Sequence, residues 1–278
     1  MGDPAPTQGY GERPGPYRAS DVREGESFEL VNGHKIECSP AGTRHGESAR
    51  LGAQTLGSDP AVHSAPVDLG IEFNDGKNLR APDVAVGDFP SAPGWYKGVP
   101  PLCVEYADEH QDEADLKNKI KELQQIGVKY IWVVRLVGPL RVEVHERGKR
   151  KQLVSEHGTL TAPGVLQNPV PVRALVDAKE SEKVTLRNLL QRQGYRGLDE
   201  ALSQAREAGQ LEGRAAGEAL GRAKGKTESL LTILEARGIG LSPAQRDQIL
   251  ACREEARIGN WLRRAAAAAT AFDVLDAD

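Results

Sequence analysis

The sequence holds 278 residues with a net charge of −4, 39% hydrophobic residues and only 5% aromatic residues. This length suits one domain with a substantial extension, or two small domains, around an aliphatic core. We expect no signal peptide and no membrane contact, because no stretch approaches the roughly 18 apolar residues of a membrane helix. Three widely spaced cysteines fit neither a disulfide framework nor a zinc knuckle, so we expect a cytoplasmic protein.

The acidic balance bears on nucleic-acid binding, because dedicated DNA-binding domains are usually basic. One dense basic run is present, formed by Arg147, Lys149, Arg150 and Lys151. The run predicts either a local phosphate-binding patch or a solvated turn after a strand. The sequence leaves both interpretations open.

The N-terminal half begins with an expected disordered tail at residues 1–16, which are rich in proline and glycine. Residues 28–38 are typical of two strands joined by a type I′ turn at Asn32-Gly33. A short helix is expected between Gly46 and Leu56.

A second hairpin is expected to pair residues 67–73 with residues 83–86 around the turn at 74–76. Residues 102–106 follow as a short apolar strand. If the strands that carry Asp83 and Glu105 pair, both side chains can reach one end of the sheet.

The pattern then changes to that of a helix at residues 115–126, where Leu116, Ile120 and Leu123 form one apolar stripe. Gly127 is placed to cap that helix in the left-handed conformation. Residues 128–136 and 140–145 predict the strongest strand pair, joined at Gly138-Pro139. Strands, a helix and further strands predict a mixed α/β (α+β) fold with helical cover.

The last hundred residues, 179–278, are expected to form a helical extension rich in alanine, leucine and charged residues. Its glycines recur every fourth residue, at Gly209, Gly213, Gly217, Gly221 and Gly225. They indicate either one bare face of a helix or a flexible, partly helical spacer. A Ser242-Pro243 pair predicts the start of a further helix, with Ser242 as its N-cap.

A possible catalytic set combines Asp83, Glu105 and Lys119. Carboxylates from adjacent strands can hold Mg²⁺, and a lysine can orient or deprotonate water or stabilise a phosphate. Taken singly, Asp83 is typical of a turn, and Asp115 with Lys119 of a surface pair. Glu105 is the sharper signal, because an unpaired carboxylate in a buried strand is expensive unless it binds metal or does chemistry.

Together these motifs resemble the Uma-two family of restriction-endonuclease-like proteins, which have the PD-(D/E)xK fold. The resemblance covers residues 17–178 and rests on four groups of residues in order: Phe28-Glu29-Leu30-Val31-Asn32-Gly33, Pro82-Asp83-Val84, Pro101-Leu102-Cys103-Val104-Glu105, and Asp115 with Lys119, Gly127-Val128 and Trp132. It implies a restriction-endonuclease-like mixed sheet flanked by helices. Residues 179–278 resemble the tail of the Rpn-type recombination-promoting nucleases.

The resemblance implies that Asp83 and Glu105 bind the metal and that Lys119 replaces a motif lysine where this chain has Ala107. Glu29 and Asp115 match further family acids that support the site. Three positions depart from the family pattern. Asp108 replaces a serine, Leu123 a tyrosine and Arg135 an aspartate.

We therefore expect a Mg²⁺-dependent endonuclease that hydrolyses DNA phosphodiester bonds, with Mn²⁺ as a substitute metal. The alternative is a catalytically weak nuclease fold that acts in binding or assembly and oligomerises through its helical tail. A structural metal site is poorly supported, because the histidines show no ligand spacing with the cysteines. The tail is too thin in apolar residues to build a large core alone, so we expect a homodimer or higher homo-oligomer.

Overall fold

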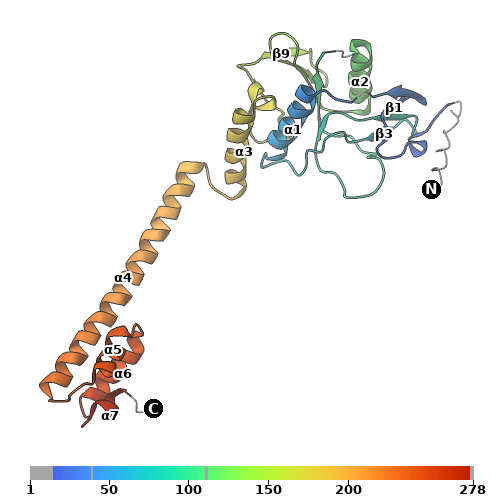
Figure 1. Cartoon of the computed structure of the whole chain (residues 1–278). Helices are drawn as coiled ribbons and strands as arrows, with labels where there is room; N and C mark the ends of the chain where they lie inside the picture. The colour runs from blue at the N-terminus through green and yellow to red at the C-terminus, as the bar shows by residue number, and fades with distance from the viewer. Residues whose placement is uncertain (1–14, 39, 110–111, 276–278) are drawn as a thin grey trace, which may run out of the picture. The chain divides into compact units, whose positions relative to one another are not determined.

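The computed structural model describes residues 15–38, 40–109 and 112–275. The tail expected at residues 1–16 therefore lies almost wholly outside the described residues. The chain divides into two compact units, Met1–Leu198 and Asp199–Asp278. The first unit holds the sheets, and the second is helical (Figure 1).

The main sheet of the first unit has the strand order β5-β6-β7-β8-β9. Its strands are β5 (Val84–Val86), β6 (Leu102–Ala107), β7 (Tyr130–Arg135), β8 (Arg141–Glu146) and β9 (Gln152–Ser155). Strands β6 and β7 are parallel, while the other neighbours are antiparallel. The parallel pair needs a crossover, and helix α2 (Glu113–Ile126) supplies it. The mixed α+β fold predicted from the sequence is confirmed.

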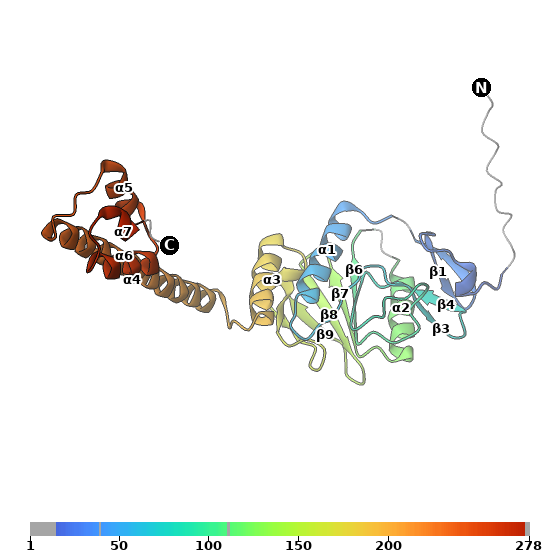
Figure 2. The ribbon, with the colours of Figure 1, turned by 90° about the horizontal axis from the view of Figure 1, so that it is seen from below.

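Helices cover both faces of this sheet (Figure 2). Helices α1 (Thr43–Gly57) and α3 (Ala178–Arg192), with the 3-10 turn η2 (Val172–Leu175), bury one face around Trp132 and Tyr106. Helix α2 buries the other face through its expected stripe, with Leu123 fully buried. Gly127 ends α2 at a φ of 111°, as predicted for a left-handed cap.

A smaller antiparallel sheet has the strand order β2-β1-β4-β3. It consists of β1 (Phe28–Val31), β2 (His34–Glu37), β3 (Ile71–Phe73) and β4 (Asn78–Arg80), and the 3-10 turn η1 (Ala19–Asp21) precedes it. Asn32 and Gly33 both have positive φ, at 49° and 81°, so the predicted type I′ turn is confirmed.

The second predicted hairpin is wrong in its pairing. Strand β3 pairs with β4 around the Asn74–Gly76 turn, whereas residues 84–86 form β5 of the main sheet. A single bridge between Val67 and Val84 remains of the expected ladder. Asn78–Arg80 is short and contains a charged residue, so its period did not indicate a strand.

Helix α3 belongs to the first unit, whereas the sequence analysis placed residues from 179 onward in the helical extension. Thr55 Oγ1 and Ser181 Oγ lie 2.8 Å apart, and Asn188 donates to Ser58 Oγ at 2.9 Å. These buried polar contacts fasten α3 to α1. A short strand pair, β10 (Thr159–Leu160) with β11 (Val170–Pro171), precedes the helix.

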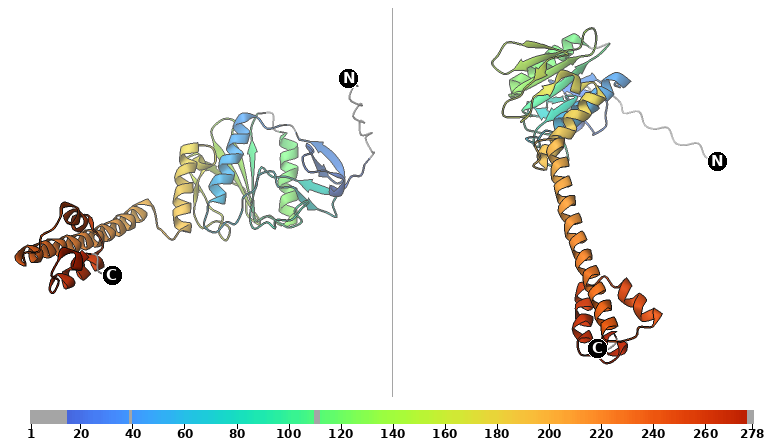
Figure 3. Two further views of the ribbon diagram at one scale, coloured as in Figure 1. Left: turned by 60° about the horizontal axis from the view of Figure 1, so that its bottom comes forward. Right: turned by 90° about the vertical axis from the view of Figure 1, so that its left-hand side faces the viewer.

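The second unit contains α4 (Leu198–Ala236), α5 (Pro243–Ala251), α6 (Glu255–Ala265) and α7 (Ala271–Leu275). Figure 3 shows the short helices packed around the C-terminal part of α4. The five regularly spaced glycines lie inside α4, which favours the helical interpretation over the flexible spacer. Ser242 caps α5 and Pro243 begins it, as predicted. Within the described residues no helix has the length and apolar character to cross a bilayer.

Candidate active site

Glu105 is the centre of a buried group of charges on the α2 face of the main sheet. It lies on β6, whose residues are all buried, and 5% of its surface is exposed. Its Oε2 lies 3.1 Å from Lys119 Nζ, while its buried Oε1 has no hydrogen-bond partner among the described residues. Burial, together with the Asp83 and Glu29 carboxylates, raises the pKa of Glu105 to about 8, although Lys119 opposes this rise.

Lys119 is held on α2 by the way that helix docks on the sheet. Asp112 caps the helix by accepting from Ala114 N and Asp115 N, and the apolar stripe then faces the sheet. Lys119 is 8% exposed and donates to the carbonyl oxygen of Ala81 at 2.7 Å. Burial lowers the pKa of Lys119, but the Glu105, Glu29 and Asp83 carboxylates raise it more. The ammonium group therefore keeps its proton.

Asp83 reaches the same place from the residue before β5. Val84 pairs with Val104 in the antiparallel ladder, which sets Asp83 beside Glu105. Asp83 Oδ2 accepts from Tyr106 N at 2.6 Å, and Oδ1 lies 3.1 Å from His45 Nε2. The structure thus brings Asp83, Glu105 and Lys119 together, and their catalytic roles remain a prediction.

Glu29 and Asp115 are also present, but both bind an arginine that the sequence analysis missed. Arg80 is fully buried, with Nη1 2.6 Å from Glu29 Oε2 and Nη2 3.0 Å from Asp115 Oδ1. Glu122 Oε2 accepts from Arg80 Nε at 2.6 Å. The expected surface pair of Asp115 with Lys119 is therefore replaced by a pair of the half-buried Asp115 with the fully buried Arg80.

Glu29 connects this arginine to the site lysine. Its Oε1 lies 3.2 Å from Lys119 Nζ and accepts from Ala81 N at 2.9 Å. Burial raises the pKa of Glu29, but Lys119 and Arg80 lower it more, so the carboxylate stays charged. No signal for Arg80 is visible in the sequence, because β4 has only three residues and is too short to show a period.

His45 is a second residue that the sequence analysis missed. It lies in the first turns of α1, and its contact with Asp83 raises its pKa more than burial lowers it. Neighbouring Arg44 donates to Asp108 Oδ2 at 2.9 Å. No spacing rule indicated His45, because it meets Asp83 through the packing of α1 against the main sheet.

The donor set fits a metal ion held largely by substrate and water. No group of three or more histidine, cysteine or acidic side chains within residues 15–38, 40–109 and 112–275 could hold a metal ion. Asp83 and Glu105 supply two carboxylates, and Oε1 of Glu105 is a buried acceptor for which the described residues supply no donor. Mg²⁺ commonly binds through one or two carboxylates, waters and substrate phosphates, so the pair suffices.

Comparison with known proteins assigns the family. The Uma2 family model, described as "Putative restriction endonuclease", matches residues 15–173. The chain belongs to the Uma2 family. This membership supports a nuclease and bears out the predicted resemblance, whereas the likeness of the tail to Rpn-type nucleases gains no support. No curated protein matches this Uma2 chain.

Solved structures that are similar to the chain include a putative nuclease belonging to DUF820 from Anabaena variabilis ATCC 29413. The two sequences are 14% identical, and the TM-score is 0.49. The match covers 56% of this chain and 94% of that chain.

The three departures from the Uma2 pattern leave Asp83, Glu105 and Lys119, the acidic–lysine set, intact. Leu123 is buried in the apolar core between α2 and the sheet. Arg135 pairs with Glu143 at 2.9 Å and also with Glu113. Asp108 accepts from Arg44, as described above. Each replacement is absorbed by local packing or by an ion pair outside the set.

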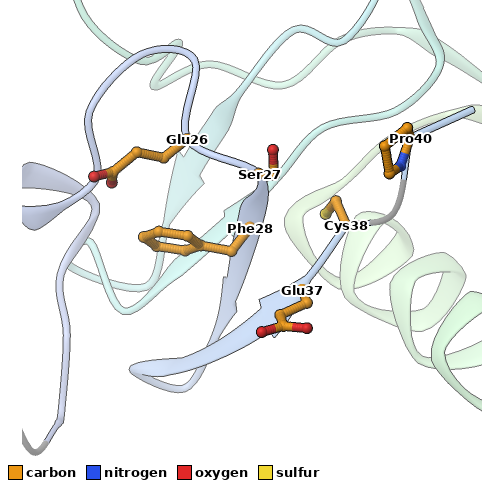
Figure 4. A pocket seen from close by; sticks show the side chains of 6 residues that line it. All are labelled: Glu26, Ser27, Phe28, Glu37, Cys38 and Pro40. Carbon is orange, nitrogen blue, oxygen red and sulfur yellow. The ribbon is translucent and has the colours of Figure 1, made fainter. Parts of the chain in front are cut away.

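Two other candidate regions contain none of the residues Asp83, Glu105 and Lys119. The basic run forms the β8–β9 turn, where Lys149 pairs with Glu146 and Lys151 with Glu143. Its own acidic neighbours thus partly neutralise it, which favours a solvated turn. A shallow hollow beside the β1–β2 hairpin is shown in Figure 4, and it is lined by Glu26, Ser27, Phe28, Glu37, Cys38 and Pro40. Neither region adds a residue to the acidic–lysine set.

Proposed function

We propose that this Uma2 protein is a Mg²⁺-dependent endonuclease that hydrolyses phosphodiester bonds in DNA, with Mn²⁺ as a substitute metal. Asp83 and Glu105 are the proposed metal ligands, and Lys119 is the proposed cationic group at the scissile phosphate. The observation that carries the proposal is the buried Glu105, which has one oxygen bound to Lys119 and the other without a hydrogen-bond partner in the part of the chain that the structure describes. Such a carboxylate is costly unless a ligand uses it.

In the proposed reaction, the oxygen of water bonds to phosphorus, one ester P–O bond breaks, and the leaving oxygen takes up a proton. A bound metal ion would polarise the phosphate and lower the pKa of the attacking water. Lys119 stabilises the negative charge that develops on the phosphate, because its raised pKa makes it a poor base. From the sequence alone, Lys119 could orient water, deprotonate water or stabilise a phosphate. We propose the last of these roles.

Residues around the set would hold it in position before substrate arrives. Glu29 and the Ala81 carbonyl orient the Lys119 ammonium, while Arg80 holds Glu29 in turn. Tyr106 N and His45 orient Asp83. Prepositioned charges cost little reorganisation during the reaction, which is the main advantage of such a site.

The alternative function is binding or assembly by a nuclease fold with weak activity. The specific observation in its favour is that both Asp83 oxygens already have partners, so a metal would compete with His45 for Oδ1. The net charge of −4 also disfavours tight binding of DNA.

One experiment separates these functions. Supercoiled, linear and single-stranded DNA are incubated with wild type and with Asp83→Ala, each in Mg²⁺, Mn²⁺ or chelator. An endonuclease nicks supercoiled DNA only with metal and loses that activity in the variant. Absence of metal-dependent cleavage by wild type on every substrate contradicts the enzymatic proposal and leaves the binding function.

We also propose a cytoplasmic location. Cys38, Cys103 and Cys252 are all free. Free thiols support a reducing compartment, since oxidising compartments favour disulfides.

A further inference from the structure

None of the described residues of the second unit covers the N-terminal half of α4. Every residue from 202 to 222 is exposed, including Leu202 at 45%, Leu211 at 68% and Leu220 at 52%. Gly209, Gly213 and two further glycines weaken this stretch as a helix. Helical stability in proteins comes mainly from packing of an apolar face, so this half of α4 needs a partner.

One continuous stripe of mostly small and apolar residues runs along α4. It is exposed in its first half and buried in its second half. Its positions advance in alternating steps of four and three residues through Gly209, Gly213, Ala216, Leu220, Ala223, Thr227, Leu230 and Leu234. The last four are buried, and this part of α4 packs in the core with Ile258 and Trp261. The first four are exposed. This alternation is the pattern of helices that pack lengthwise against one another.

The buried part of the stripe corrects one step of the expectation of self-association. The tail was expected to be too thin in apolar residues to build a large core alone, but Leu230 and Trp261 lie in the core of their own unit, at 0% and 2% exposure. What remains for a partner is the exposed half.

The charges on α4 are arranged in two opposite blocks. Residues 199–212 carry four acidic side chains and one basic, whereas residues 213–226 carry four basic and one acidic. Arg222 and Lys226 of the basic block also pair with Glu255 on α6, so its net excess is partly offset. A second α4 running in the opposite direction would place each acidic block against a basic block.

We propose that a second copy of this chain packs antiparallel along the exposed stripe, forming a two-fold symmetric dimer. Leu202 and Leu220 are 18 residues apart, which is five helical turns, so they share a face. A two-fold axis at the level of Leu211 sets Leu202 of each copy against Leu220 of the other. Gly209 then faces Gly213, where an added Cβ would meet nothing within the single chain and two backbones can approach closely.

The same axis places Asp199 of each copy near Lys224 of the other, so this contact occurs twice. It also brings the start of each α4 to the level of Ala223, where burial by the short helices begins. The interface thus occupies the uncovered length of the helix. Both copies use the same patch, as a two-fold interface requires.

Sedimentation equilibrium of the full chain measures the dimer dissociation constant and so tests whether the exposed stripe of α4 is the interface. Leu202→Arg and Leu220→Arg should each raise the dimer dissociation constant by at least about tenfold. Leu211→Arg is the matched control, because this leucine is more exposed and lies on the opposite side of α4. It should leave the dissociation constant unchanged. Circular dichroism verifies that all three variants stay folded.

Orientation is tested by exchanging charges. Asp199→Lys and Lys224→Glu should each weaken the dimer, while an equal mixture of the two variants should associate as wild type does. In a parallel pair, Asp199→Lys would exchange one like-charge contact for another and leave association unchanged.

Three results would overturn the proposal, and none depends on nuclease activity. They are a wild-type monomer up to roughly 100 μM, equal weakening by Leu211→Arg, and a dimer that tolerates both stripe substitutions. The first of these results includes an association that appears only with added DNA, which would assign the stripe to another partner.

Discussion

The two units differ in which side chains lie in unusual surroundings. The first buries ionisable side chains, and the second exposes apolar ones. In the first unit, Arg80, Lys119 and Glu105 are ionisable groups buried among aliphatic strands. In the second, Leu202 and Leu220 are apolar groups exposed along a helix. Buried charges demand partners inside the fold, and exposed leucines demand partners outside it. Both therefore point to function more clearly than residues in their usual surroundings.

The largest effect on stability is expected for Arg80→Met. This change leaves the Glu29, Asp115 and Glu122 carboxylates without their shared cation and should lower the free energy of unfolding by about 3–5 kcal/mol. Arg50→Met is the control, because the Arg50–Glu47 pair is exposed and its loss should lower the free energy of unfolding far less. Urea unfolding measures both. Equal losses would mean that burial of the Arg80 network contributes nothing special.

Lys119→Met should have the next largest effect, and it should fall mainly on catalysis. Loss of the cation at the developing charge predicts a decrease in kcat of roughly 10²–10³-fold, with some destabilisation because Glu105 and Glu29 lose a partner. Lys117→Met on the exposed side of α2 serves as the control. Initial rates on supercoiled DNA test this. Unaltered kcat in Lys119→Met would remove the lysine from the reaction.

Glu105→Gln should stabilise the metal-free protein while disabling the site. Burial raises the pKa of the Glu105 carboxyl to about 8 in the folded protein, above its pKa in the unfolded protein. The folded protein therefore loses stability as the pH rises from the unfolded-state pKa through the folded-state pKa. The variant should gain about 1–3 kcal/mol in chelator above pH 8. The gain should vanish below the unfolded-state pKa, where wild type is also protonated. A lower Tm for the variant at high pH would contradict this account.

The smallest effects are expected for glycine-to-alanine substitutions, which should raise the stability of a helix in the second unit and lower it in the first. Gly213→Ala should stabilise an isolated α4 by about 1 kcal/mol, because its Cβ would meet nothing. Gly52→Ala should destabilise α1, because its Cβ would collide with the ring and hydroxyl of Tyr106. Thermal melts at low concentration, where the proposed dimer is dissociated, compare them. Matching signs would show that close packing does not distinguish the two helices.

Much of the first unit could be predicted because local patterns agree with the final fold. The Asn32-Gly33 turn, the α2 stripe and the Gly127 cap are each specified within a few residues. The pairing of residues 84–86 could not, since strand partners depend on the whole sheet. Likewise β4 is too short to show a period, so Arg80 stayed outside any predicted element.

The site divides in the same manner. Asp83, Glu105 and Lys119 could be identified from order, spacing and family resemblance. Their neighbours Arg80 and His45 meet the set only through packing of β4 and α1, which no local spacing records. Similarly, the α4 glycines left helix and spacer equally open, because propensity alone does not tell what covers a face.

The central claim is that Asp83 and Glu105 hold a divalent metal beside Lys119. Calorimetric titration of Mn²⁺ into wild type and Glu105→Gln at pH 8.5, roughly at the raised pKa, tests it most directly. We expect wild type to bind and the variant to bind at least about tenfold more weakly, or not at all. Equal affinities, with both proteins folded, would contradict the claim and leave Glu105 as a polar residue that the fold merely tolerates.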